Sequence, residues 1–190
     1  MTTPTTVEKF GSGLLIRMAD GTRWRAIESV GDSWVVSSVE ESAVPLPPTG
    51  DRFIFPASLN LVTSEYGQRN GRLHAGIDFS SGSGGGAGAG DPMLASSAGK
   101  VQISSASHGG YGETVVLDHG NGLATLYAHM QAGSRTVGVG AIVTQGQKLG
   151  NVGKTGQSFG NHIHFETHEG GYRWNASAVN PREFIPKWNR

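Results

Sequence analysis

Apolar and polar residues follow one another along this chain in short runs that lack a helical period. Runs such as VVSSV, TVVLD and LATLY are rich in β-branched and aromatic residues, which favours strands. Asp20-Gly21 and Asn121-Gly122 each separate two such runs, a pairing typical of tight β-hairpins. Glycine accounts for 30 of the 190 residues, against roughly 7% in average proteins. The pattern therefore predicts an all-β protein with many tight turns.

Proline marks a boundary between two regions of the chain. Residues 1 to about 41 contain three strand-like runs, which form a sheet that is marginal by itself. This part is either a cap packed on the main domain or an attachment module. The segment ESAVPLPPTGD that follows is typical of a stiff linker. We therefore predict a small β-rich N-terminal region with its linker over 1–48 and the main domain over 49–190.

The main domain continues as strand-like segments separated by glycine-rich turns. These segments are MLASSAGKVQIS, ETVVLDH, LATLYAHM and AIVTQGQKLGNVG. Gly82 to Gly90 reads GSGGGAGAG, which cannot pack a core and predicts a mobile surface loop. A phosphate-binding loop is a poor alternative, because no GKS or GKT ending and no helical pattern follow. Pro181 suits the first position of one short helical turn.

Charge and composition exclude several classes of protein. The 15 basic residues balance the 15 acidic ones and do not cluster, so we expect no nucleic-acid partner. No stretch approaches 18 apolar residues, so we expect no insertion into a membrane. The chain has no cysteine, which excludes disulfides and sulfur-based zinc sites. Any metal must therefore be held by histidines and carboxylates.

Two histidine spacings suggest such a site. His162 and His164 lie two apart, so in a strand both side chains point to the same face. His74 and Asp78 can meet on one ion only if the chain bends between them, and Gly76 permits that bend. A catalytic zinc takes three protein ligands and leaves a fourth position for water. Spacing alone does not show that these residues share one site.

The segments GRLHAGIDF, LYAHM and GNHIHFE resemble the three active-site motifs of the LytM/lysostaphin-type peptidases, family M23. The flanking text GDPMLASSAGKV and GQKLGNVGKTG is also similar to that family, and the resemblance covers about residues 53–185. It implies an antiparallel β-sheet domain of LytM type. It also implies a zinc metalloendopeptidase that hydrolyses peptide cross-links or bridges of bacterial peptidoglycan.

Carried over by position, the resemblance makes His74, Asp78 and His164 the ligands of one zinc ion. It makes His129 and His162 the two catalytic histidines that do not bind the metal. One would take a proton from water, and the other would stabilise the oxyanion or protonate the leaving amine. Which histidine has which role stays open.

Several other residues carry weaker expectations. Glu166 shares the strand face of His164, as a partner of a metal ligand or as an exposed polar residue. We expect His119 to be exposed, and we expect no catalytic role for it or for His108 and His168. Tyr66 and Tyr111 could line the groove, although hairpin packing is favoured. Two departures from the family bear on the substrate: the spacer between Arg69 and His74 is short, and the glycine insert either borders the groove or is inert.

Two other functions compete with the enzyme. A catalytically silent LytM-type domain would bind the wall or activate another hydrolase, but the five intact histidine and aspartate positions argue against it. A carrier module of biotinyl-lipoyl type needs a lysine at a hairpin tip, and Lys148 and Lys154 lie outside any convincing two-residue hairpin.

The cellular setting is an expectation from the first residues, which show no signal peptide. We expect a monomeric, phage-encoded enzyme that acts at the bacterial cell wall, either as a released lysin or as a virion-associated enzyme with other virion proteins as partners. A bacterial enzyme exported by other means is the alternative. An export signal encoded upstream in the full gene would contradict this expectation. The scissile bond, in a glycine bridge or between D-alanine and a diamino acid, stays open.

Overall fold

The computed structural model describes residues 53–57, 61–69, 71–80, 88–120 and 122–185 with their side chains, and the backbone of four N-terminal strands. The chain divides into two compact units, Met1–Ala43 and Val44–Arg190. The predicted boundary at residue 48, the linker and most of the Gly82–Gly90 insert lie outside the described residues. The boundary therefore stays a prediction.

The N-terminal unit is a four-stranded antiparallel sheet with its strands in sequence order. Its strands are β1 (Pro4–Phe10), β2 (Gly13–Met18), β3 (Arg23–Val30) and β4 (Ser33–Ser38). The pairing of β2 with β3 confirms the hairpin that Asp20-Gly21 predicted. Strand β1 was not predicted, because its sequence is mostly polar and begins with proline. Proline is tolerated at the first residue of an edge strand, which is its place here.

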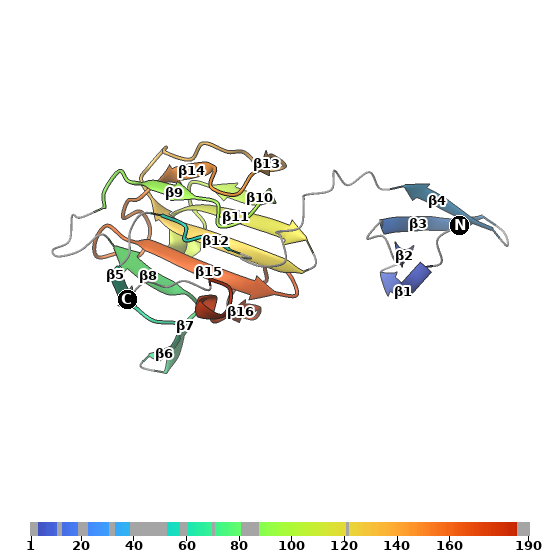
Figure 1. The fold of residues 1–190 in the computed structure, drawn as a ribbon, viewed down its shortest axis with the longest axis horizontal. Helices are drawn as coiled ribbons and strands as arrows, with labels where there is room; N and C mark the ends of the chain where they lie inside the picture. Colours follow the sequence, from blue (N-terminus) through green and yellow to red (C-terminus); the bar gives the residue numbers. More distant parts are fainter. Residues whose placement is uncertain are drawn as a thin grey trace. The chain divides into compact units, whose positions relative to one another are not determined.

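The second unit is built on an eight-stranded antiparallel sheet (Figure 1). Its order is β13 (Ile142–Val143), β10 (Gly99–Ser105), β11 (Glu113–Gly120), β12 (Leu123–Met130), β15 (Ile163–Glu169), β8 (Ile77–Ser80) and β5 (Leu61–Ser64), with β16 (Ala178–Val179) paired to β15. Two small sheets pair β14 (Lys148–Asn151) with β9 (Pro92–Leu94) and β6 (Gly67–Arg69) with β7 (Arg72–His74).

Helix is limited, among the described residues, to the 3-10 turns Gly109–Tyr111 and Pro181–Glu183. The second turn begins at Pro181, as predicted, and the side chain of Asn180 caps it by accepting from the Arg182 amide. No helix in this part of the chain is long or apolar enough to cross a membrane. The predicted all-β antiparallel fold is confirmed.

Two predicted strand segments are each divided between two sheets. MLASSAGKVQIS breaks at the buried serines Ser96 and Ser97, giving β9 on one side and β10 on the other. AIVTQGQKLGNVG breaks at Gly146, whose φ of 77° lies in the left-handed region. The strands on either side of each break bury apolar side chains in the same core. The apolar pattern therefore continues across the break, and each pair of strands reads in the sequence as a single strand.

The two faces of the large sheet differ in chemistry. On one face Val115, Leu117, Tyr127 and Phe165 join the main core, which also takes residues from the loops and the small sheets. The alternate residues point to the other face, where a small apolar cluster contains Val116, Leu126 and Ala128. In β15 that second face carries His164, Glu166 and His168, each of them buried. The polar residues of the site therefore lie opposite the main core.

His119 was expected to be exposed, and this expectation is wrong. Its side chain is 1% exposed, and its ring nitrogens lie 2.7 Å from the Ala98 carbonyl oxygen and 2.7 Å from Thr125 Oγ1. Burial lowers the pKa of His119, although the hydrogen bond to Ala98 opposes the change. Alternate residues of a strand point to the same face, so His119 points inward together with Val115 and Leu117. The alternation along β11 therefore indicated that His119 is buried.

Gly76 lies at the bend between β7 and β8, where the chain passes close to β15. A Cβ atom at this position would collide with the Phe165 carbonyl oxygen and would lie 2.9 Å from Glu166 Cγ. We expect Gly76→Ala to lower the free energy of unfolding by about 1–3 kcal/mol, because the strand backbone cannot shift without disturbing the sheet. Urea denaturation followed by circular dichroism measures this change.

Gly138→Ala is the matched control. Gly138 is exposed, and a Cβ atom added there would have no neighbouring atom within 4 Å. Its replacement should change the free energy of unfolding by less than about 0.5 kcal/mol. Equal effects of the two substitutions would show that close packing at Gly76 does not constrain the fold.

Candidate metal centre

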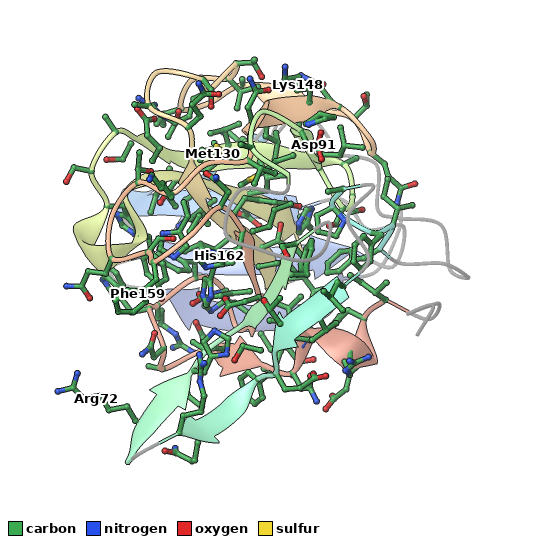
Figure 2. All side chains as sticks on the ribbon, turned by 90° about the vertical axis from the view of Figure 1, so that its left-hand side faces the viewer. Arg72, Asp91, Met130, Lys148, Phe159 and His162 are labelled. Carbon is green, nitrogen blue, oxygen red and sulfur yellow. The ribbon has the colours of Figure 1, made fainter. Side chains whose placement is uncertain are left out.

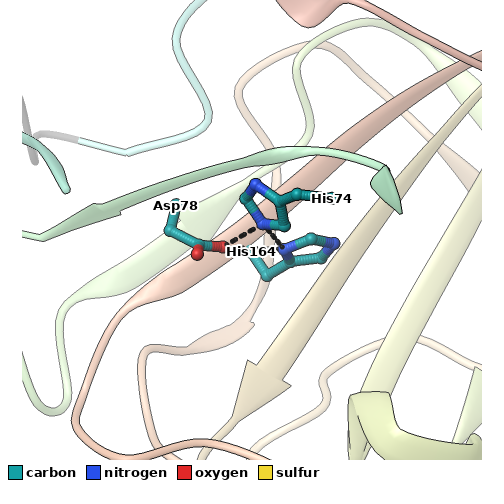
Figure 3. A group of neighbouring side chains, drawn as sticks. All are labelled: His74, Asp78 and His164. Atoms are coloured by element: carbon teal, nitrogen blue, oxygen red, sulfur yellow. Dashed lines mark hydrogen bonds and ion pairs between the residues drawn. The ribbon is translucent and has the colours of Figure 1, made fainter. Parts of the chain in front are cut away.

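Three side chains from three strands converge on one point (Figure 3). His74 ends β7, Asp78 lies in β8, and His164 lies in β15 directly opposite Asp78 in the ladder. His74 Nε2 is 3.1 Å from Asp78 Oδ1 and 3.1 Å from His164 Nδ1. His164 Nδ1 is 2.7 Å from Asp78 Oδ1. The structure thus brings together the three residues that the sequence proposed as ligands.

The other ring nitrogen of each histidine has a partner that fixes the position of the proton. His74 Nδ1 lies 2.7 Å from the Glu65 carbonyl oxygen, which only accepts, so Nδ1 carries the hydrogen. His164 Nε2 lies 2.8 Å from a carboxylate oxygen of Glu166 and carries its hydrogen for the same reason. When both rings are neutral, their remaining nitrogens point lone pairs at Asp78 Oδ1. Three acceptors then face one another, which is repulsive unless a cation lies between them.

The charges around this point favour such a cation. Burial opposes a charged His164, but its hydrogen bonds with Asp78 and Glu166 outweigh burial and raise its pKa to about 9. Burial would also raise the pKa of Asp78, yet hydrogen bonds from His164 and His74 hold that pKa well below its usual range. Asp78 is therefore ionised, and the space between the three atoms attracts either a proton or a metal ion.

The donor set fits a divalent metal such as zinc. Bonds of about 2.0–2.1 Å in a tetrahedron separate two ligand atoms by roughly 3.3 Å. The observed separations of 2.7 Å and 3.1 Å approach that value. Two imidazoles and one carboxylate also form a common ligand set of catalytic zinc, with the fourth position open.

Glu166 connects the candidate ligands to the surrounding structure. Its carboxylate is fully buried, and it lies 2.8 Å from His164 Nε2 and 2.8 Å from His168 Nε2. The Tyr111 hydroxyl donates a third hydrogen bond at 2.7 Å. Burial would raise the pKa of Glu166, but the bonds from His164 and His168 outweigh it and lower the pKa to about 2. Of the two interpretations left open, the buried partner of His164 is the one that the structure shows.

Tyr111 and His168 do more than their sequence suggested. Hairpin packing was favoured for Tyr111, but its ring lines the groove and its hydroxyl contacts Glu166. The sequence spacing gave no indication of this contact between Tyr111 and Glu166. His168 contacts none of the three candidate ligands, and it holds Glu166 in place through a hydrogen bond. A signal for His168 existed, since His164, Glu166 and His168 alternate along one strand face. Tyr66, by contrast, packs against the core and donates to the Ala178 carbonyl.

The three candidate ligands line an open groove of about 470 Å³. His129 and His162 line the same groove, and their ring centroids lie 4.7 Å apart. Phe159 and Trp174 also contribute to its walls, and both are exposed. Figure 2 shows His162 and Phe159 on this face of the domain. The groove is therefore open to solvent, and its walls are partly aromatic.

His129 and His162 each present one nitrogen to the groove. His129 Nδ1 lies 2.8 Å from the Thr155 carbonyl oxygen, and His162 Nδ1 lies 2.9 Å from that of Gly160. Both Nδ1 atoms therefore carry the hydrogen, which leaves Nε2 as an acceptor. His162 Nε2 lies 3.7 Å from Asp78 Oδ1. Burial lowers the pKa of His129 to about 4, so its ring is neutral near pH 7.

A backbone irregularity aims His129 at the groove. Strand alternation in β12 sends Tyr127 into the core and would send His129 there as well. Instead His129 has a φ of 59°, and the register of β12 against β11 shifts beside it. Met130 then enters the core in its place. A bulge with a left-handed residue costs about 1–3 kcal/mol, and such strain is concentrated at functional sites.

Comparison with known proteins identifies the family of this chain. The family model described as Peptidase family M23 matches residues 72–181, more than half of the chain. The chain belongs to peptidase family M23. This is a metallopeptidase family, and the candidate ligands His74 and Asp78 and His164 all lie within the matched range.

Several relatives of this M23 domain are named peptidases. It is 36% identical over 148 residues to the DD-carboxypeptidase/endopeptidase Mpg of Neisseria meningitidis, covering 75% of this chain and 31% of that protein. The catalytic domain of the prophage-encoded M23 protein EnpA from Enterococcus faecalis is 33% identical, with a TM-score of 0.57, and the match covers 67% of this chain and 92% of that one. The catalytic domain of lysostaphin from Staphylococcus simulans is 28% identical, with a TM-score of 0.55, over 69% and 93%. The fold is thus that of LytM-type M23 domains.

Replacing Glu166 tests its part in the candidate metal centre. Glutamine keeps the shape of glutamate but replaces one of its two acceptor oxygens with an NH2 donor. It can therefore accept a hydrogen bond from His164 or from His168, but not from both. We expect Glu166→Gln to weaken zinc binding by about 10–100-fold, the usual effect of losing a hydrogen-bonded partner of a metal ligand. Competition with a chromogenic chelator measures the affinity.

Glu169→Gln provides the control for that change. Glu169 lies at the end of the same strand and is exposed, so the charge change is identical but no contact with His164 is lost. Its zinc affinity should match that of the wild type. If Glu166→Gln also binds zinc as the wild type does, then Glu166 does not support the ligand His164.

Proposed function

We propose that this M23 domain is a zinc-dependent endopeptidase that hydrolyses peptide cross-links or bridges of bacterial peptidoglycan. The observation that carries the proposal is the convergence of three acceptor atoms in an open groove beside two further histidines. Mpg and the Vibrio cholerae peptidoglycan DD-endopeptidase ShyC, 34% identical over 124 residues, support the substrate class. The chain spans 31% of the length of Mpg and 25% of the length of ShyC. The activities of these longer proteins are therefore carried to this chain only as part of the proposal.

In this proposal His74, Asp78 and His164 hold one zinc ion. Zinc bound there would polarise the scissile carbonyl and lower the pKa of the attacking water toward about 7. The protein fixes the two imidazole tautomers through Glu65 and Glu166, so the ligand nitrogens need no rearrangement.

His129 and His162 carry the proton transfers. Each has its Nδ1–H held by a backbone carbonyl and its Nε2 free to accept a proton. One of them takes a proton from the attacking water as general base. The other, once protonated, donates to the oxyanion or to the leaving amine. The low pKa of His129 keeps its ring in the neutral form that the base requires, while the division of roles between the two stays open.

Release of muropeptides from purified peptidoglycan tests the function. We expect the zinc-loaded wild type to generate new amino termini that mass spectrometry detects. His164→Ala and a chelated sample should release none, and zinc should restore the chelated sample. His129→Ala and His162→Ala should still bind one zinc per chain but lose activity by at least about 100-fold, because general acid–base catalysis contributes about that much.

One outcome would contradict the enzymatic function and favour a catalytically silent domain. If the wild type binds zinc yet releases nothing from walls with glycine bridges or with D-alanine–diamino acid cross-links, the domain is catalytically silent. It would then bind the wall or activate another hydrolase.

The phage setting stays a prediction. Its support is the relationship to EnpA, which is described as prophage-encoded. An association with other virion proteins likewise remains a prediction.

A further inference from the structure

Arg69 is the one arginine or lysine among the described residues that line the groove. It ends β6, close to the metal centre, and its side chain is half exposed. Its Nη1 donates to Ser64 Oγ at 2.6 Å, and its Nη2 lies 3.9 Å from Asp78 Oδ2. The guanidinium is thus held at one point, and a single bond to Ser64 leaves N–H donors for a ligand, since arginine has five.

The groove carries a net positive charge once a divalent metal is bound. Asp78 is the one carboxylate among the described lining residues, and it contributes a single negative charge. The metal contributes two positive charges and Arg69 adds a third. A groove with this balance attracts an anionic group, and the planar fork of arginine matches a carboxylate in particular.

The position of Arg69 indicates where that carboxylate lies on the substrate. Asp78 places one oxygen toward the metal and the other toward Arg69, so one carboxylate group separates the guanidinium from the metal. A scissile carbonyl at the metal is followed by the amide nitrogen and then by the carbon that bears the next carboxyl group. That carboxyl carbon lies about 3.5 Å from the scissile carbonyl carbon, so a carboxylate bound by Arg69 beside Asp78 lies within one residue of a carbonyl at the metal position.

We propose that Arg69 recognises a free carboxylate on the carbon bonded to the scissile nitrogen. This inference rests on the proposed peptidase function and selects its substrate class. Such a carboxylate occurs on a C-terminal residue and on a diamino acid that is acylated through the amino group beside its free carboxyl group. An internal glycine of a bridge lacks it, because its carboxyl group is consumed in the next amide. Arg69 is therefore a specificity-determining residue that favours the carboxylate-bearing bond.

A pair of synthetic peptides isolates this contact. Both contain D-alanine joined to a D-amino acid, which ends in a free carboxylate in one peptide and in a carboxamide in the other. With the zinc-loaded wild type we expect kcat/KM to be at least about tenfold higher for the acid, as for a charge-assisted hydrogen bond. Arg69→Gln should reduce the acid-to-amide ratio to near one, mainly by slowing the acid. Arg69→Lys should give an intermediate ratio, because it keeps the charge and loses the fork.

Arg72→Gln is the matched control. Arg72 pairs with Arg69 across the β6–β7 hairpin, but it is exposed and its side chain extends away from the domain (Figure 2). The substitution removes the same charge from the same hairpin, and the acid-to-amide ratio should stay at the wild-type value. Zinc titration and circular dichroism of each variant check that it is loaded and folded.

The outcomes separate the inference from the function on which it rests. Equal cleavage of acid and amide by the wild type would overturn the role of Arg69 and leave the peptidase function standing. So would an unchanged ratio in Arg69→Gln, or faster cleavage of a pentaglycine peptide than of the acid. If the zinc-loaded wild type cleaves none of these peptides and releases no muropeptides, the peptidase function fails and the inference fails with it.

Discussion

Two imidazole nitrogens and one carboxylate oxygen face one another at 2.7–3.1 Å, an arrangement that needs a proton or a metal ion between them. Much of the surrounding structure maintains this otherwise repulsive arrangement. The pairing of β8 with β15 sets Asp78 opposite His164, and Glu65 and Glu166 hold the two ring tautomers. A buried cluster of acceptors is costly unless a cation completes it, so binding a metal and stabilising the fold are linked here.

The large sheet supports this arrangement by separating its two faces. One face supplies the main hydrophobic core, and the other carries His164 together with Glu166. Strands that are buried on both faces give the site rigid support, which a reaction that depends on close positioning requires. The exception is His129, which reaches the groove through a strained residue at a bulge. The strained backbone at His129 directs its neutral imidazole to a position beside the candidate metal site.

The sequence predicted the parts of the site that follow from strand periodicity and from family motifs. His162 and His164 line the same groove, which agrees with the shared face that the HxH spacing predicted, and the bend at Gly76 was expected. The close approach to β15 at Gly76 was not expected, because it depends on a strand that is distant in sequence. The same limit applies to Tyr111, whose hydroxyl reaches Glu166 across 55 positions of sequence. Strand alternation along β11 indicates a buried His119, whereas the adjacent Asn121-Gly122 turn favours an exposed one.

The central claim is that His74, Asp78 and His164 form a three-ligand zinc site with one open position. X-ray absorption spectroscopy of the zinc-loaded protein tests it most directly. We predict one zinc per chain with four nitrogen or oxygen ligands at about 2.0–2.1 Å, two of them imidazoles, and one imidazole fewer in His74→Ala. Weak substoichiometric binding, or a shell of six oxygen atoms without imidazole, would contradict it.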